Sequence, residues 1–223
     1  MQPFASMTSS TDGFEPRIDE RPVDRPWGQV RWPIDPATAL ARGGLTLSLA
    51  GERDAPELFA ALDHDACWEH VRGRPADIGA LAATIAAAPA AGRWPWIVRL
   101  DGAVVGTTSF LDVSPVDARL EIGFTCYAPH AWGTAVNPTC KLLLMGWAFD
   151  AAGFGRVQMK TDVRNARSQR AIAGLGAMCE GTLRRYQRRQ DDTVRDTVMF
   201  SVIAEDWPVV RARLESRAAR RSN

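Results

Sequence analysis

Nine residues, from His130 to Pro138, form a run of mostly small side chains that leads directly into a helix. Asn137 is a favourable N-cap and proline suits the first helical position, so we expect the helix to begin at Pro138. Gly133 and Ala135 have little or no side chain, which lets a ligand approach the main chain. Consecutive N–H groups at the positive end of a helix dipole bind phosphate groups. The run predicts a phosphate or pyrophosphate site; the alternative is an ordinary loop before a capped helix.

Composition and charge describe a globular chain without a strong electrostatic preference. The 223 residues carry 27 lysines and arginines against 26 aspartates and glutamates, a net charge of +1. This balance argues against a general nucleic-acid or membrane-surface partner. No apolar run approaches the roughly 20 residues of a membrane span, and residues 1–13 lack the apolar core of a signal peptide. We therefore expect a soluble cytoplasmic protein.

Metal chemistry is not indicated by the histidines and cysteines. The chain has three histidines, and its cysteines form no C-x-x-C pair and have no histidine nearby at zinc-ligand spacing. We expect no metal site, and buried or half-buried free thiols in a reducing compartment. The four cysteines are Cys67, Cys126, Cys140 and Cys179.

Residues 1–30 are predicted to form a flexible arm, because prolines and charged residues punctuate them. Residues 31–223 fit a single domain. Trp27, Trp32 and Pro33 close the arm with apolar side chains. We expect these side chains to pack on the core of their own chain; packing on a second subunit, as in a homodimer, is the alternative.

Hydrophobic spacing divides the remaining chain into strands and helices. Asp54 is expected to cap a helix together with Glu57, Asp101-Gly102 is typical of a hairpin turn, and Gly176 is expected to end a helix. The order indicates a mixed α/β fold with a largely antiparallel sheet. The predicted strands are 45–49, 96–100, 103–110, 119–125, 156–161, 179–188 and 194–203, and the predicted helices begin near residues 54, 78, 138, 166 and 208.

Four short motifs stand in order on these elements. They are Glu121-Ile122-Gly123-Phe124, His130-x-x-Gly133-x-Ala135, Asn165-x-x-Ser168 and Leu175-Gly176-Ala177. With them, the stretch from about Leu45 to Trp207 resembles the GNAT acetyltransferases, whose pyrophosphate signature is Arg/Gln-x-x-Gly-x-Gly/Ala. Within that family it looks most like the RimJ/RimL-like branch, which acetylates ribosomal-protein N-termini. The resemblance implies the GNAT fold, a twisted central sheet flanked by helices, with splayed central strands.

The resemblance also implies acetyl-CoA or another acyl-CoA as co-substrate, without a metal, and an amine as acceptor. The main chain of Trp132–Asn137 would bind the pyrophosphate. Phe124–Cys126 would splay from Val157–Lys160 and accept the amides of the pantetheine arm as a strand does. The residues that the resemblance places at the CoA are Phe124, Thr125, Cys126, His130, Trp132, Gly133, Thr134, Ala135, Val136, Asn137, Asn165 and Ser168.

Acyl transfer to an amine needs a proton acceptor for the amine and a proton donor for the leaving thiolate. By resemblance, Ser168 faces the sulfur as the donor, and Asn165 bonds the pantetheine. A helix cap is the alternative for Ser168, and a turn residue or an N-cap is the alternative for Asn165.

Glu121 is the first candidate for the base, acting through a water molecule. Its side chain is expected on the face opposite Leu120, Ile122 and Phe124. The alternative is a structural carboxylate that pairs with an arginine across the sheet.

Gln187 occupies the position where the RimJ/RimL-like branch has a glutamate on the strand after the short helix, and glutamine cannot act as a base. Asp162 and His130 are weaker candidates, and an amine that arrives neutral needs no strong base. The final hairpin also carries an arginine cluster, for which a solvated basic face is preferred to a contact with an acidic acceptor or the CoA 3′-phosphate. Its members are Arg184, Arg185, Arg188 and Arg189.

Two functions from different classes follow. The first is an acyl-CoA-dependent N-acetyltransferase that acts on a protein N-terminus or a small-molecule amine. The second is a non-catalytic acyl-CoA-binding or sensor module that keeps the pocket without the chemistry. A nucleotide-binding protein is disfavoured because no Gly-x-Gly-x-x-Gly or Gly-x-x-x-x-Gly-Lys-Ser/Thr pattern is present.

Overall fold

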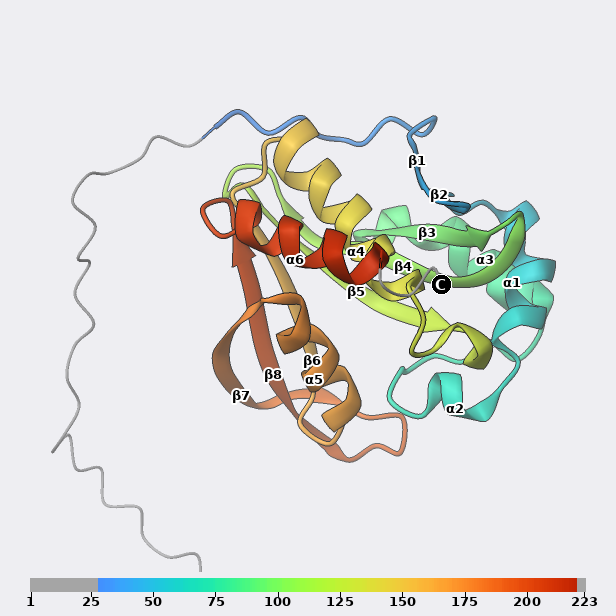
Figure 1. Ribbon diagram of the computed structural model, residues 1–223. Helices are drawn as coiled ribbons and strands as arrows, with labels where there is room; N and C mark the ends of the chain where they lie inside the picture. The colour runs from blue at the N-terminus through green and yellow to red at the C-terminus, as the bar shows by residue number, and fades with distance from the viewer. Residues whose placement is uncertain (1–27, 220–223) are drawn as a thin grey trace, which may run out of the picture.

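An eight-stranded sheet forms the centre of the computed structural model, which describes residues 28–219 (Figure 1). Its strands are β1 (Ala39–Arg42), β2 (Leu45–Leu49), β3 (Arg93–Leu100), β4 (Ala103–Ser114), β5 (Arg119–Tyr127), β6 (Arg156–Asp162), β7 (Met178–Arg188) and β8 (Val194–Ile203). Its α-helices are α1 (Ala55–Leu62), α2 (Asp65–Trp68), α3 (Ile78–Ala87), α4 (Val136–Gly146), α5 (Ala166–Leu175) and α6 (Trp207–Ala219). Short helical turns are η1 (Glu52–Asp54), η2 (Pro89–Ala91), η3 (Pro129–Ala131) and the π-helical η4 (Trp147–Ala151).

The strands follow the order β1-β2-β3-β4-β5-β6-β8-β7, and all neighbours are antiparallel except β5 and β6. Those two run parallel because the connection between them contains α4, which returns the chain to the end of the sheet where β5 began. The predicted α/β class with a largely antiparallel sheet is confirmed. Strand β1 was not expected from the sequence; it pairs with β2 through Gly43 and Gly44, whose φ angles of 52° and 78° suit glycine.

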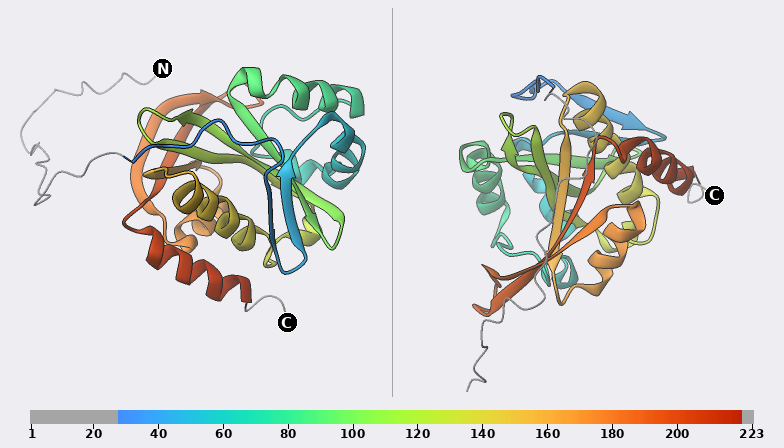
Figure 2. Two further views of the ribbon diagram at one scale, coloured as in Figure 1. Left: turned by 90° about the horizontal axis from the view of Figure 1, so that it is seen from above. Right: turned by 90° about the vertical axis from the view of Figure 1, so that its left-hand side faces the viewer.

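Helices cover both faces of this sheet (Figure 2). Helices α4, α5 and α6 lie on one face, and α1, α2 and α3 lie on the other. Two apolar clusters result, one beneath α4 and α6 around Leu144 and Leu214, the other beneath α1 and α3 around Leu58 and Ile97. Within residues 28–219, no helix has both the length and the apolar character needed to cross a membrane.

The segment before β1 packs on the core of its own chain. The ring centroid of Trp32 lies 4.7 Å from that of Trp94 and 6.1 Å from that of Phe154. The packing predicted for Trp32 is confirmed, whereas Pro33 stays exposed. Trp27 and all but the last three residues of the predicted arm lie outside the described residues.

The chain enters α1 differently from the prediction. Asp54 makes no side-chain cap for this helix. Its Oδ2 accepts a hydrogen bond from the Gly51 N–H at 2.9 Å, and its Oδ1 accepts one from Arg99 of β3 at 3.1 Å. Glu57 also pairs with Arg99, at 2.6 Å. The predicted capping box is wrong because the carboxylates of Asp54 and Glu57 both bind Arg99 of β3.

Three of the four thiols are buried. Burial raises the pKa of Cys67, and it raises the pKa values of Cys126 and Cys140 to about 12. Cys179 is exposed, so the expectation of burial is wrong for this residue. The reason is its position on β7, every residue of which is exposed.

Candidate active site

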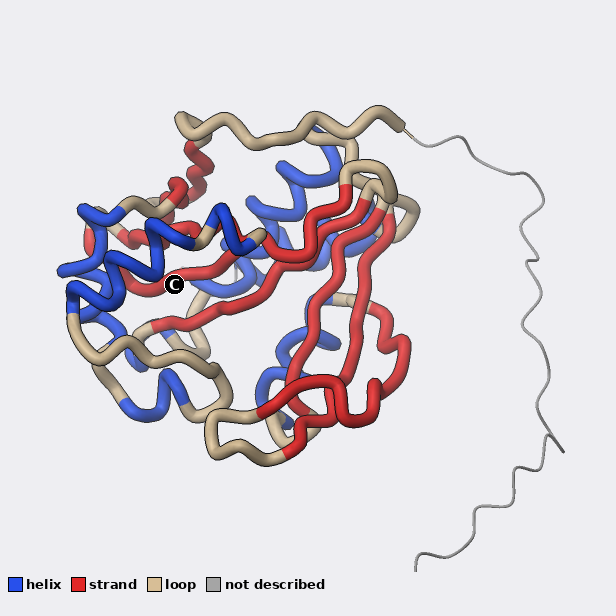
Figure 3. Tube along the Cα trace, turned by 180° about the vertical axis from the view of Figure 1, so that it is seen from behind, coloured by secondary structure: helices blue, strands red, loops and turns tan. Residues whose placement is uncertain are grey.

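Strands β5 and β6 part soon after they begin. Arg119, Leu120 and Glu121 pair with Arg156, Val157 and Gln158, and the ladder ends there. Beyond this point β5 continues alongside β4 and β6 continues alongside β8, so the two groups of strands fan out in different directions (Figure 3). The predicted splay of the central strands is therefore confirmed. It leaves two facing strand edges, which can hydrogen-bond an extended ligand that carries amide groups.

A β-bulge at Phe124 shapes the edge of β5. Gly123 pairs with Ser109 and Cys126 with Thr107, so two residues of β5 oppose one of β4, and Phe124 has a φ of 48°. The bulge turns the Phe124 side chain toward the cluster beneath α1 and α3. The expectation that Phe124 shares a face with Leu120 and Ile122 is therefore wrong, because the bulge interrupts the alternation.

The turn predicted to bind phosphate lies between β5 and α4. Gly133 has a φ of 74°, and the Thr134 Oγ1 accepts a hydrogen bond from the Val136 N–H at 3.2 Å. Helix α4 begins at Val136, so Asn137 is its second residue and not its N-cap. The predicted helix start is wrong by two residues because Thr134 contacts the first N–H. Pro138 still lies in the first turn, where a missing N–H costs no intrahelical bond.

The turn after β5 meets the first turn of α5, which follows β6. The Arg167 guanidinium lies 4.3 Å from the centre of the Trp132 ring, whose Nε1 donates to the Tyr127 carbonyl at 2.7 Å. Asn165 caps α5, because its Oδ1 accepts from the Ser168 N–H at 2.9 Å. Ser168 is thus the third residue of the helix and not its cap, while the contacts of Asn165 and Ser168 with CoA remain predictions.

Glu121 lies on β5 where the two strands part. It is 3% exposed, and its Oε2 lies 2.7 Å from the Lys160 Nζ of β6, which also lies 3.2 Å from Asp112. The predicted structural partner was an arginine; the cation is a lysine instead. Burial raises the pKa of Glu121 more than Lys160 lowers it. A carboxylate with a raised pKa at this position can accept a proton.

Lys141 is a buried cation beside Thr125 that the sequence reasoning missed. It is 5% exposed on α4, and its Nζ donates to the Thr125 Oγ1 at 3.4 Å. That oxygen also lies 2.7 Å from the Thr108 Oγ1 of β4. Burial lowers the pKa of Lys141 to about 8. The signal was available, since Lys141 is the single charged residue in a helix that is otherwise apolar or uncharged.

The two remaining candidates for the base are Asp162 and His130, and Gln187 stands where the RimJ/RimL-like branch has a glutamate. Asp162 forms a two-point contact with Arg189, at 2.6 and 2.9 Å; although burial raises its pKa, these bonds and the Arg164 N–H lower it below the ordinary value. His130 and Gln187 are exposed. The arginine cluster lies on β7 and the turn after it, where Arg188 pairs with Asp192 at 2.7 Å.

A pocket opens on the face of the sheet away from α4, between α1, α3 and strands β3 to β5. The empty space along it is about 380 Å³, and this volume includes open solvent. Leu58, Leu81 and Ile85 contribute to its apolar wall, and Arg93 is the one charged residue that lines it among residues 28–219. Phe124 belongs to two parts of the site, because its side chain lines the pocket and its main chain lies on the opened edge of β5.

Comparison with known sequences identifies related proteins. A profile of the family described as Acetyltransferase (GNAT) domain matches residues 45–178. The uncharacterized N-acetyltransferase p20 of Bacillus licheniformis is 26% identical over 117 residues, which cover 52% of this chain and 65% of that protein. The chain therefore spans slightly less than two thirds of this relative.

Solved structures share the fold over most of the chain. A protein from T. thermophilus that is assigned as an acetyltransferase is 33% identical, with a TM-score of 0.75 over 84% of this chain and 99% of that one. RimJ of Mycobacterium smegmatis, solved with CoA-disulfide, is 22% identical, with a TM-score of 0.69 over 79% of this chain and 90% of that one. The similarity to RimJ shows a shared fold alone.

Proposed function

Because the chain belongs to the GNAT acetyltransferase family, we propose that it is an N-acyltransferase that transfers an acetyl group from acetyl-CoA to a primary amine. The observation that carries this proposal is the parting of β5 and β6 directly after the buried Glu121. An acyl donor in that opening would lie beside a carboxylate whose pKa is raised.

The donor is proposed to bind along the opened strand edge. Its pyrophosphate would contact the main chain of Trp132–Asn137, where the positive end of α4 favours an anion. Its pantetheine amides would pair with β5 near the Phe124 bulge, and Asn165 and Ser168 would lie beside the thiol end. Support for this path comes from the contact between Trp132 and Arg167, which brings the turn and the start of α5 together.

The proposed reaction is direct transfer in a ternary complex. The amine nitrogen attacks the thioester carbonyl carbon, a C–N bond forms, the C–S bond breaks and the sulfur leaves as a thiolate. Glu121 would take the amine proton through a water molecule, and the Ser168 hydroxyl would give a proton to the thiolate and regain one from solvent. An amine that arrives neutral would need Glu121 less, since it can attack before it loses a proton.

The finer assignments are also proposals. The acceptor is a protein N-terminus, as in the RimJ/RimL-like branch, or a small-molecule amine. The reducing cytoplasm is the proposed compartment, supported by four cysteines without a disulfide. The near-neutral charge supports neither a nucleic acid nor a membrane as partner. A homodimer remains a prediction that size-exclusion chromatography with light scattering can check.

Two measurements test the proposed function. Calorimetry with acetyl-CoA, succinyl-CoA and CoA reports donor binding, and thiol release with a panel of amines reports turnover. We expect acetyl-CoA to bind and at least one amine to release thiol with an acetylated product in the mass spectrum. Binding without turnover of any amine would favour the non-catalytic acyl-CoA-binding module, and absence of acyl-CoA binding would overturn both readings.

A further inference from the structure

Arg93 is a half-buried cation without an acidic partner among residues 28–219. It is the first residue of β3, and it lines the pocket beneath α1 and α3. Its Nη2 donates to the Thr84 carbonyl at 3.3 Å, and its guanidinium lies 4.6 Å from the centre of the Phe124 ring. A guanidinium has five N–H donors, so most of them remain available to a ligand.

The other end of β3 shows what a paired arginine looks like in this fold. Arg99 contacts Asp54 at 3.1 Å and Glu57 at 2.6 Å, two carboxylates on the start of α1. Arg93 has a hydrogen bond to a carbonyl and a stacked aromatic ring in their place. Burial of a charge costs free energy unless an opposite charge or hydrogen bonds compensate it, so the position of Arg93 favours an anion in the pocket.

The pocket also connects with the reacting centre proposed above. Phe124 lines it, and the main chain of Phe124 belongs to the edge where β5 leaves β6. The Glu121 carboxylate lies beside Gly123, the residue before Phe124, since a Cβ placed on Gly123 would come within 2.6 Å of the Glu121 Oε1. An amine held in the pocket can therefore approach the proposed base and the thioester together.

We propose that this pocket binds the acceptor, and that the acceptor is a small amine that carries a carboxylate and an apolar side chain, as an apolar amino acid does. This inference rests on the proposed function. Arg93 pairs with the carboxylate in a two-point contact. Leu58, Leu81 and Ile85 contact the apolar side chain. The amine then points past Phe124 toward Glu121.

A carboxylate fits this pocket better than a phosphate group. Arg93 supplies one positive charge, which a carboxylate neutralises. A phosphate monoester carries about 1.5 to 2 negative charges at neutral pH and would leave the excess in an apolar wall. A peptide N-terminus lacks the carboxylate at this distance from its amine, so the contact with Arg93 would be lost for peptides.

The first test measures binding and does not depend on turnover. The probe is 3-phenylpropanoate, which has the carboxylate and an apolar ring but no amine, and its control is 3-phenylpropanamide. We expect calorimetry, on the free protein and on the protein mixed with CoA, to show binding of the acid about tenfold or more tighter than binding of the amide, the range of a charge-assisted hydrogen bond. In Arg93→Met this preference disappears, since methionine keeps an apolar stem without the charge. Equal binding of acid and amide by the wild-type protein overturns the inference.

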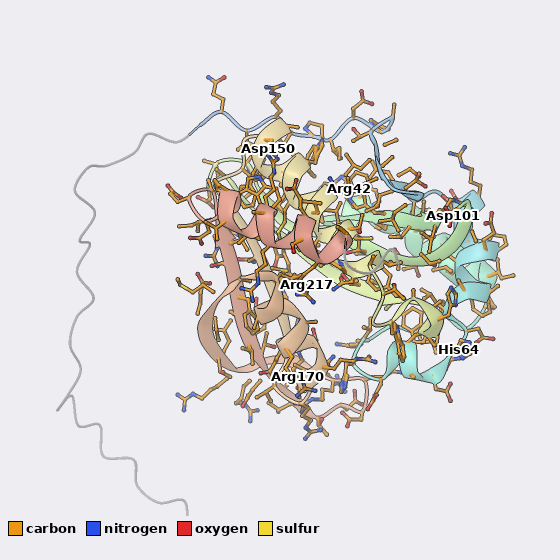
Figure 4. The ribbon with its side chains drawn as sticks, in the orientation of Figure 1. Arg42, His64, Asp101, Asp150, Arg170 and Arg217 are labelled. Atoms are coloured by element: carbon orange, nitrogen blue, oxygen red, sulfur yellow. The ribbon has the colours of Figure 1, made fainter. Side chains whose placement is uncertain are left out.

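The second test measures selectivity between matched amines. Thiol release is compared for phenylalanine and phenylalaninamide, with each rate normalised to the neutral fraction of its amine. We expect Arg93→Met to lower kcat/KM for phenylalanine about ten- to hundredfold and to change kcat/KM for the amide and the affinity for acetyl-CoA less than twofold. Arg42→Met is the matched control, because it removes an exposed arginine on β1 (Figure 4).

The outcomes separate this inference from the proposed function. Turnover that prefers the amide, and that Arg93→Met leaves unchanged, overturns the inference and leaves an N-acetyltransferase. Failure of acyl-CoA binding overturns the proposed function, whereas binding of the phenylpropanoate probe through Arg93 would still identify a carboxylate pocket. Equal effects of Arg93→Met and Arg42→Met assign the change to net charge and overturn the role of Arg93.

Discussion

Replacing Glu121 with glutamine tests the proposed base, because the change removes the charge and keeps the shape. Two effects on stability oppose each other. The raised pKa means that burial of the charge costs more than Lys160 compensates, so a neutral amide removes a cost. Lys160 loses a partner at 2.7 Å but keeps Asp112 at 3.2 Å, and 14% of its side chain is exposed. We therefore expect the free energy of unfolding to change by at most about 2 kcal/mol, below the roughly 3–5 kcal/mol for breaking a fully buried pair.

The assay combines melting with steady-state kinetics. A change of about 2 kcal/mol corresponds to a shift in Tm of roughly 4–8 °C for a chain of this size. If Glu121 is the base, kcat in Glu121→Gln falls by about 100-fold or more, equivalent to about 2.7 kcal/mol in the barrier. The affinity for acetyl-CoA stays the same, since the carboxylate is not proposed to touch the donor.

The pH dependence gives a second readout for the same variant. Activity that needs ionised Glu121 rises with pH through its pKa, which lies above the ordinary 4.5, and Glu121→Gln lacks this limb. The free energy of unfolding changes with pH in the opposite direction. Folding raises the pKa of this carboxyl group, so its protonated form stabilises the folded chain. That contribution is fully present below the pKa of the unfolded chain and is lost as pH rises through the pKa of the folded chain. Chemical denaturation across this range should show that loss in the wild-type protein and not in Glu121→Gln.

Asp112→Asn is the matched control, because Asp112 contacts the same lysine from an exposed position. We expect this control to keep turnover within about twofold, an effect below about 0.5 kcal/mol. The reasoning would be refuted if Glu121→Gln lowered Tm strongly while the folded fraction kept its full kcat. In that case Glu121 would be structural, and an amine that arrives neutral would be the simplest mechanism.

Three further predictions concern the donor site and the buried lysine. Gly133→Val should weaken acetyl-CoA binding at least tenfold, about 1.4 kcal/mol, because a φ of 74° disfavours a β-branched residue; unchanged affinity in calorimetry removes the turn from the site. Ser168→Ala should lower kcat by roughly 10²–10⁴-fold with little effect on donor affinity, since the cap from Asn165 uses the main chain of residue 168; full kcat would leave Ser168 without a catalytic role. Relative to the wild type, Lys141→Met should lose stability as pH rises from about 8 toward 10.5. In this range Lys141 of the unfolded wild-type chain still holds a proton that the folded chain has lost, so the wild type gains stability with pH and the variant does not. A difference between the urea midpoints of the two proteins that stays the same at all pH values would contradict a lowered pKa.

The sequence predicts those parts of the site that depend on local residue types. Gly133 predicts the turn because glycine has little steric restriction, and Asn165 predicts the start of a helix because asparagine favours the N-cap. Both preferences depend only on residues nearby in the sequence. The alternation of β5 likewise places Glu121 opposite Leu120 and Ile122. Each of these features follows from the spacing of residues along the chain.

Other parts depend on pairing between distant segments. Phe124 has a positive φ although its residue type gives no sign of one, since the bulge arises from the register between β4 and β5. The partner of Glu121 is Lys160 because a parallel register aligns β5 with β6, and nothing local to either residue selects it. Arg93 reaches Phe124 only because β3, β4 and β5 lie side by side.

The unequal burial of the four cysteines sets how this protein reacts with thiol reagents. Cys67, Cys126 and Cys140 have raised pKa values, so little thiolate is present at neutral pH and little reagent can reach it, whereas Cys179 is exposed. A colorimetric assay of CoA release therefore starts with a background of one equivalent per native chain. The same reagent counts four equivalents once the chain unfolds, so the cysteines also report unfolding in the cuvette used for kinetics. A dye attached through maleimide chemistry will label β7 at a single position.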